Sequence, residues 1–245
     1  MTDILYESVF ELNSIISEIN SEFIFESIML ENDENKIIDV DYKEVNGDKK
    51  EESIQKKKSF LEKVKSAWKA FVAAMKRMIK SCIGFIKKNK TEIKETAEVK
   101  IYVTDRSEML AGFKRLNDDV MSGKAIKKII DAGRVGDEYV SRSFTRTFDE
   151  KKVLVDKDDA IRILEKQLNE AEKLISGFDK QVDDFLRDAE RKISNIESTA
   201  DRLMVSYGVQ AVTNARNHYK ELIQEIVMEI QEVASRKNDM QEKEK

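Results

Sequence analysis

The apolar residues of this chain recur mostly every three or four positions, which is the spacing of amphipathic helices. Residues 3–30 carry one such pattern, with glutamates between the apolar positions. Residues 55–88 carry a second, and its large side chains fall within an arc of about 120° on a helical wheel. We define the apolar stripe as the members of this arc other than Cys82: Leu61, Val64, Trp68, Phe71, Val72, Met75, Ile79, Ile83 and Ile86.

The last third of the chain has the most regular pattern. Apolar residues alternate steps of three and four from Ile161 to Phe185, resume after a one-residue phase slip, and form another run from Val212 to Val233. Sustained heptads of this kind are typical of coiled coils. Glycine often follows the last turn of a helix, so the pattern predicts a helical hairpin that turns at Gly208. The alternative is one continuous rod, since no cluster of turn residues surrounds this glycine.

The segment between these helical regions has a mixed pattern. Residues 98–103 (EVKIYV) alternate like a half-buried strand, and residues 151–156 (KKVLVD) are a second candidate strand. Asp105 followed by Glu108 matches a helix-capping pattern ahead of another apolar run. A short strand over residues 36–42 (KIIDVDY) is predicted in the same way.

These patterns predict a mainly α fold, built from long amphipathic helices with a C-terminal helical hairpin or coiled coil and a small α/β insert around residues 93–156. The absence of proline from all 245 residues agrees with long uninterrupted helices. We expect an acidic N-terminal helix with a polar linker, then a basic amphipathic helix, a small unit of helix and strand, and a long helical coiled-coil region. Their ranges are residues 1–52, 53–92, 93–156 and 157–245.

Charge divides sharply between the first two segments. Residues 1–52 carry 15 acidic and 4 basic side chains, whereas residues 53–100 carry 14 basic and 4 acidic ones, in a chain of net charge −4. Adjacent blocks of opposite sign neutralise one another within a chain or between copies. The basic residues that flank the apolar stripe form what we call the basic face: Lys63, Lys69, Lys76, Arg77, Lys80, Lys87 and Lys88.

A basic amphipathic helix fits an anionic membrane surface, a groove in another protein or the helical core of its own chain. The acidic helix over residues 3–30 has a similar length and the opposite charge, so we expect it to pair with the apolar stripe. The longest uncharged runs near the stripe have six residues, whereas a membrane-spanning helix needs about 20. We therefore expect no transmembrane helix, and the acidic start of the chain argues against a signal peptide.

Few residues are candidates for catalysis or metal binding. His218 is the single histidine and Cys82 the single cysteine, so a zinc site of the usual composition is excluded. Both residues follow apolar helical patterns, for which packing is the better interpretation. The sequence also has no glycine-rich phosphate loop. We expect a protein that is not an enzyme, with no cofactor and no small-molecule substrate.

Arg134, Arg142 and Arg146 are candidate phosphate contacts, because serine, threonine and aromatic residues are interleaved with them. Nearby acidic residues dilute their charge, and the net charge of the whole chain is negative. Dedicated nucleic-acid binders are instead strongly basic. Nucleic acid is therefore a less favoured partner than another protein or an anionic membrane.

The first 90 residues resemble internal structural virion proteins of large tailed phages. The resemblance rests on aromatic-Glu-Ser units at residues 6–8 and 25–27, followed by the basic tryptophan-containing helix over residues 60–88. It implies a packaged protein, located in the virion or the host cytoplasm. Some such proteins lose an acidic N-terminal piece to a head protease, and the triplets at residues 16–18 and 24–26 match that cleavage pattern. The resemblance implies no catalytic residue.

We therefore expect a non-enzymatic structural or interaction protein, a component of the phage head interior. It would bind copies of itself or other assembly proteins through its amphipathic helices and coiled coil. The first alternative is a peripheral membrane protein that places residues 60–88 in the lipid interface. The second is a nucleic-acid-associated factor that uses residues 124–146.

Overall fold

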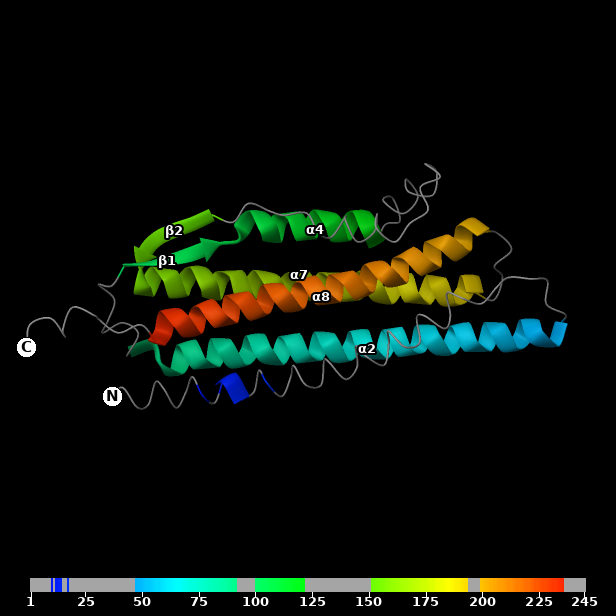
Figure 1. Cartoon of the computed structure of the whole chain (residues 1–245), viewed down its shortest axis with the longest axis horizontal. Helices are drawn as coiled ribbons and strands as arrows, with labels where there is room; N and C mark the ends of the chain where they lie inside the picture. The colour runs from blue at the N-terminus through cyan, green and yellow to red at the C-terminus, as the bar shows by residue number, and fades with distance from the viewer. Residues whose placement is uncertain are drawn as a thin grey trace, which may run out of the picture.

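The chain folds into an elongated helical bundle with a small sheet at one end (Figure 1). The computed structural model describes residues 10, 12–14, 17, 47–91, 100–121, 151–193 and 199–235. The long helices are α2 (Gly47–Lys88), α7 (Lys157–Ile193) and α8 (Thr199–Ser235). Helix α4 (Ser107–Met121) and a pair of strands, β1 (Lys100–Asp105) and β2 (Lys151–Asp156), lie on the side of α7 and α8 opposite to α2. The predicted mainly α fold with a small α/β insert is confirmed.

Helices α7 and α8 run antiparallel as a helical hairpin (Figure 1). The predicted hairpin is therefore correct, but the predicted turn at Gly208 is wrong. Helix α7 ends at Ile193 and α8 begins at Thr199, so Gly208 lies inside α8. A Cβ atom placed on Gly208 would lie 2.1 Å from Cζ of Phe185. This glycine therefore allows an aromatic ring of α7 to pack against the backbone of α8, and it does not end a helix.

Helix α2 begins at Gly47, inside the region predicted as polar linker, and it ends at the predicted residue, Lys88. Asn89 caps its C-terminal end. The backbone N–H and the Nδ2 atom of Asn89 both donate to the carbonyl oxygen of Phe85, at 3.1 Å and 2.9 Å. These bonds satisfy a carbonyl that the helix itself leaves without a partner.

The two predicted strands pair antiparallel, in a register that places Tyr102 opposite Leu154. Ile101 and Val103 on the inner face of β1 are buried in the core. Tyr102 and Leu154 lie on the outer face and are exposed. The sheet thus has one face on the helices and one face in solvent, as the alternating sequence predicts.

The last residue of each strand is an aspartate whose carboxylate caps the next helix. Asp105 accepts hydrogen bonds from the backbone N–H and the hydroxyl of Ser107, at 3.0 Å and 2.6 Å. These bonds hold the pKa of Asp105 below its usual value. Asp156 accepts from the backbone N–H of Asp159 at 2.8 Å, at the start of α7. The side chains therefore satisfy N–H groups that the first turns leave unpaired.

Two predicted elements fall wholly or largely outside the described residues. The predicted strand over residues 36–42 lies wholly outside them. Of the predicted helix over residues 3–30, only residues 10, 12–14 and 17 are described. Among these, Leu12 is buried and belongs to the hydrophobic core, whereas Phe10 is exposed.

Candidate interaction surface on α2

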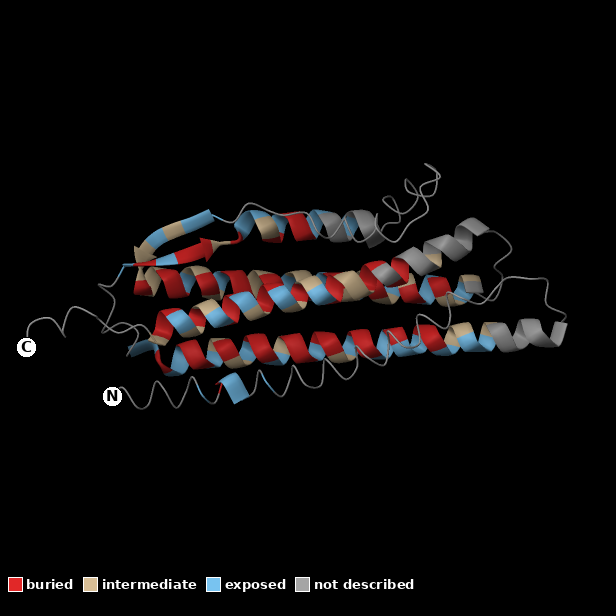
Figure 2. Cartoon of the chain, in the orientation of Figure 1, coloured by how far each residue is buried: buried red, intermediate tan, exposed pale blue. Residues whose placement is uncertain are grey.

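The apolar stripe of α2 lies inside the molecule. All its members are buried except Ile83, which is partly buried, and Trp68, Met75 and Ile79 are at most 1% exposed. Helices α7 and α8 both pack along α2, and buried positions line the sides on which these helices face one another (Figure 2). Helices α7 and α8 therefore cover the stripe, while most of the predicted partner at residues 3–30 lies outside the described residues.

Trp68 begins a row of aromatic rings that crosses the bundle. Its ring packs against Phe71 of the same helix and edge-on against Phe178 of α7, at centroid distances of 5.3 Å and 5.4 Å. Phe178 lies 6.1 Å from Tyr219 of α8, and Tyr219 stacks on Phe113 of α4 at 5.6 Å. Aromatic pairs at such distances stabilise a core beyond the area they bury. The row links α2 to α4 through the helical hairpin.

A polar contact fixes Trp68 against α7. Its Nε1 donates to Oδ1 of Asp179 at 2.9 Å, and the neighbouring Lys69 donates to the same oxygen at 2.8 Å. Lys69 also contacts Oδ2 of Asp183 at 2.6 Å. These two carboxylates outweigh the effect of partial burial and raise the pKa of Lys69. Because a buried indole N–H needs an acceptor, Asp179 selects the register of α2 on α7.

Helix α2 also has a second buried row that the predicted arc does not include. It extends the apolar side of the helix and contains two alanines: Phe60, Ala67, Ala74, Met78 and Phe85. The row belongs to the same hydrophobic core as Leu12 from the N-terminal part of the chain. Its regular spacing was a usable sequence signal, but the small alanines made it weak.

The basic face is only partly available to a partner. Lys69 is engaged with α7, and Lys76 is half-buried. The remaining members are exposed: Lys63, Arg77, Lys80, Lys87 and Lys88. Of these, Lys63, Arg77 and Lys88 take part in further polar or electrostatic interactions. Five of the seven residues of the basic face thus lie on the outside of α2, while Lys69 holds the helix against α7.

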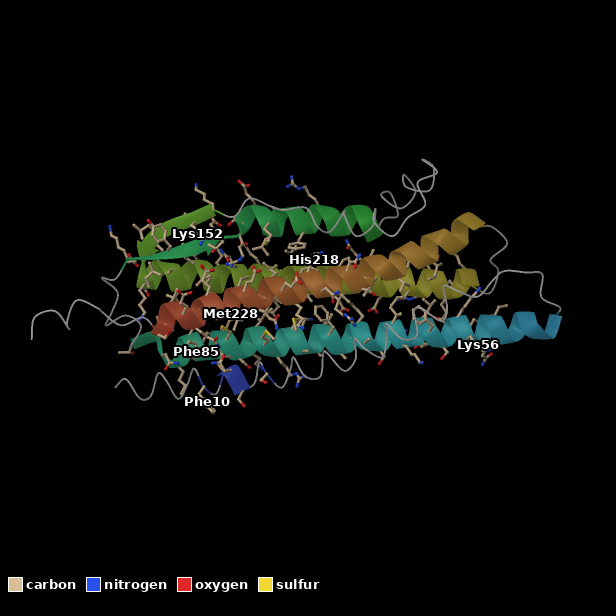
Figure 3. The ribbon with its side chains drawn as sticks, viewed as in Figure 1. Phe10, Lys56, Phe85, Lys152, His218 and Met228 are labelled. Carbon is tan, nitrogen blue, oxygen red and sulfur yellow. The ribbon has the colours of Figure 1, made fainter. Side chains whose placement is uncertain are left out.

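Cys82 and His218, the two candidates for catalysis or metal binding, both pack against other side chains. Burial, and then the nearby charge of Glu165, raise the pKa of the Cys82 thiol to about 12, so the reactive thiolate is rare at neutral pH. His218 of α8 lies on the side of that helix that faces α4, with its ring centroid 6.2 Å from that of Phe113 (Figure 3). Among the residues that the structure describes, no cluster of His, Cys, Asp and Glu is suited to a metal ion.

A polar network missed by the sequence analysis joins the sheet to the hairpin. Arg106, which is buried, contacts Oε2 of Glu229 at 2.6 Å and Glu225 at 3.7 Å. The other oxygen of Glu229 accepts from the backbone N–H of Thr104 at 2.7 Å. Gln167 of α7 donates to the carbonyl oxygen of Thr104 at 2.9 Å. These partners are far apart in the sequence, so no local pattern marks them.

The candidate phosphate contacts Arg134, Arg142 and Arg146 lie outside the described residues. Over the described parts of the chain, none of the helices combines the length and the apolar character that a membrane span requires. Comparison of the chain with protein-family models, curated proteins and solved structures finds no match in any of the three.

Proposed function

We propose that this chain is a non-enzymatic structural or interaction protein that works through self-association. The proposal rests on a pair of exposed apolar side chains on the sheet, in a protein whose long helices already bury their own apolar faces. The long helices bury their apolar faces against one another. Tyr102 and Leu154, however, remain 63% and 51% exposed while lying directly opposite each other on neighbouring strands. Adjacent exposed apolar side chains of this kind favour a contact with another protein.

In this proposal, the amphipathic helices and the coiled-coil pattern form contacts within one chain. Their apolar stripes are used between α2, α7 and α8, so contacts between copies form on surfaces outside the bundle core. A place inside a phage virion is part of the proposal and rests on the resemblance of the first 90 residues.

Sedimentation velocity of the full chain over a wide concentration range tests self-association. We expect a species of at least twice the mass of the chain, whose fraction rises with concentration. A single monomeric species at every concentration would refute the proposal.

A peripheral membrane role is the second proposal, and the exposed lysines of α2 favour it. Lys80 and Lys87 are exposed on the same side of the helix, and each lysine near an anionic lipid surface contributes about 1 kcal/mol. Trp68, however, reaches lipid only if α2 leaves α7 and α8. The third proposal, a nucleic-acid-associated role, rests on the sequence of residues 124–146.

A further inference from the structure

Among the residues that the structure describes, the sheet has only β1 and β2, and the outer edge of β2 has no further strand beside it. On β1, the backbone N–H and C=O of Thr104 are bound by Glu229 and Gln167, which come from α8 and α7. Both groups therefore point away from β2. In an antiparallel ladder, this makes Thr104 and its opposite residue Lys152 a non-hydrogen-bonded pair. The backbone groups of Lys152 must consequently point to the outer edge of β2.

The same direction repeats at every second residue of the strand, hence at Leu154 and at the N–H of Asp156, whose C=O accepts within α7 instead. Within the described part of the chain, no backbone–backbone hydrogen bond ends on this outer edge. An edge of unpaired N–H and C=O groups is a template for another strand. The outer edge of β2 therefore offers both backbone groups and an exposed apolar side chain.

We propose that β2 pairs antiparallel with β2 of a second copy, about a two-fold axis at Leu154. This inference rests on the proposed self-association and names its contact. A two-fold contact requires a surface that complements itself. One face of β2 carries Lys152, Leu154 and Asp156, which are positive, apolar and negative in that order. Antiparallel pairing places Lys152 opposite the partner's Asp156 and Leu154 opposite the partner's Leu154.

The neighbouring strand extends this complementarity. Tyr102 lies beside Leu154, so the two copies form a continuous apolar row from one tyrosine to the other. Lys100 lies beside Asp156 on the other side, so this carboxylate would stand between Lys100 of its own chain and the partner's Lys152. Opposite charges and aromatic-aliphatic contacts across strands both stabilise a sheet. Leu154 and its copy then exchange two backbone hydrogen bonds. The C=O of Lys152 accepts one more from the N–H of the partner's Asp156, and the reciprocal contact brings the total to about four, because the C=O of Asp156 accepts within α7.

The predicted strand at residues 36–42 of the same chain is not the occupant of this edge. The residues that join Tyr42 to Gly47 span at most about 18 Å. Helix α2 starts at Gly47 and is roughly 63 Å long, and the sheet lies beside its other end (Figure 1). Residues 36–42 therefore cannot reach β2 of their own chain.

A disulfide trap tests the register of the proposed contact. Two hydrogen-bonded residues in an antiparallel ladder have Cα atoms about 5.5 Å apart, which suits a disulfide. In a Cys82→Ala background, Leu154→Cys should therefore give a covalent dimer under mild oxidation. Lys152→Cys is the matched control, because in the proposed register its own copy lies four residues further along the strand, roughly 13 Å away. Equal cross-linking of the two variants, or none in either, would overturn the register.

Charge reversal provides the second measurement, by sedimentation of the full chain. Lys152→Glu places two like-charge contacts in each dimer, so we expect association at least tenfold weaker than in the wild type. Lys151→Glu makes the same change in charge on the other face of the strand and should leave association unaltered. If the wild type associates and both variants match it, the β2 contact is wrong while self-association stands. If the wild type stays monomeric, both proposals fail.

Discussion

The indole nitrogen of Trp68 donates a hydrogen bond of 2.9 Å to Asp179, which lies 111 residues further along the chain. Lys69 reaches the same carboxylate, so two consecutive residues of α2 are held by one side chain of α7. This contact involves a residue of the apolar stripe itself. It decides that the stripe, which the sequence alone leaves open to lipid or to a partner, belongs to the core of its own chain.

Asp179→Ala should destabilise the fold. The substitution leaves the buried N–H of Trp68 without an acceptor, which costs about 1–3 kcal/mol of unfolding free energy. Urea denaturation followed by the emission of Trp68, the single tryptophan of the chain, measures the effect. Asp184→Ala is the matched control, because Asp184 is exposed on the same helix, and it should change stability by less than about 0.5 kcal/mol. Equal effects would show that the bond contributes nothing.

The Cys82 thiol should react slowly with a disulfide reagent in the folded protein and fast in urea. Its raised pKa of about 12, against an ordinary 9.0, lowers the thiolate fraction at pH 8 by about a thousandfold. The unfolded chain loses this proton first, so stability should fall as the pH rises above about 9 and continue to fall toward about 12. The labelling rate at pH 8 with and without urea checks the prediction. Equal rates would mean that the helices packed on α2 do not cover Cys82 in solution.

Gly208→Ala should destabilise the hairpin, because the added methyl group meets the ring of Phe185. Overpacking of this kind costs about 1–3 kcal/mol. The loss should be smaller in a Phe185→Leu background, where the ring is absent. Gly177→Ala is the control: nothing lies within 4 Å of a Cβ at that position, so it should stabilise α7 by about 0.5–1 kcal/mol. Thermal unfolding followed by circular dichroism gives all four values, and a Gly208→Ala variant as stable as the wild type would contradict the packing described.

Glu229→Ala should be among the most damaging single changes to the bundle. The substitution removes the close carboxylate partner of the buried Arg106 and the acceptor of the Thr104 N–H. Breaking a buried pair of this kind lowers the free energy of unfolding by about 3–5 kcal/mol. Glu225→Ala removes a longer, more exposed contact to the same arginine, so a loss below about 1 kcal/mol is expected. Chemical denaturation measures the stability of both variants. Equal losses would mean that the Arg106–Glu229 pair does not hold the sheet on the hairpin.

Local patterns were sufficient to predict most of the elements. The stripe from Leu61 to Ile86 and the alternation in residues 151–156 each reflect one helix or one strand, so the period of the sequence identifies them. The end of α7 was missed because Gly208 was interpreted as a helix end. The polar residues at 194–195 and 198–199 were the better signal.

Local sequence patterns could not predict which helices pack against one another. Residues 3–30 and α7 both carry acidic side chains beside an apolar stripe, so charge alone does not identify α7 as a helix that packs on α2. The deciding contacts, Trp68 with Asp179 and Arg106 with Glu229, join residues more than 100 positions apart. Such contacts depend on how whole helices pack.

Flotation of the full chain with anionic vesicles, with the emission of Trp68 recorded in the same samples, tests the central claim most directly. If the apolar stripe is part of the chain's own core, the protein should stay at the bottom of the gradient and the emission should keep the value it has without vesicles. Flotation together with a changed Trp68 emission would contradict the account, because it would mean that α2 leaves α7 and α8 for lipid.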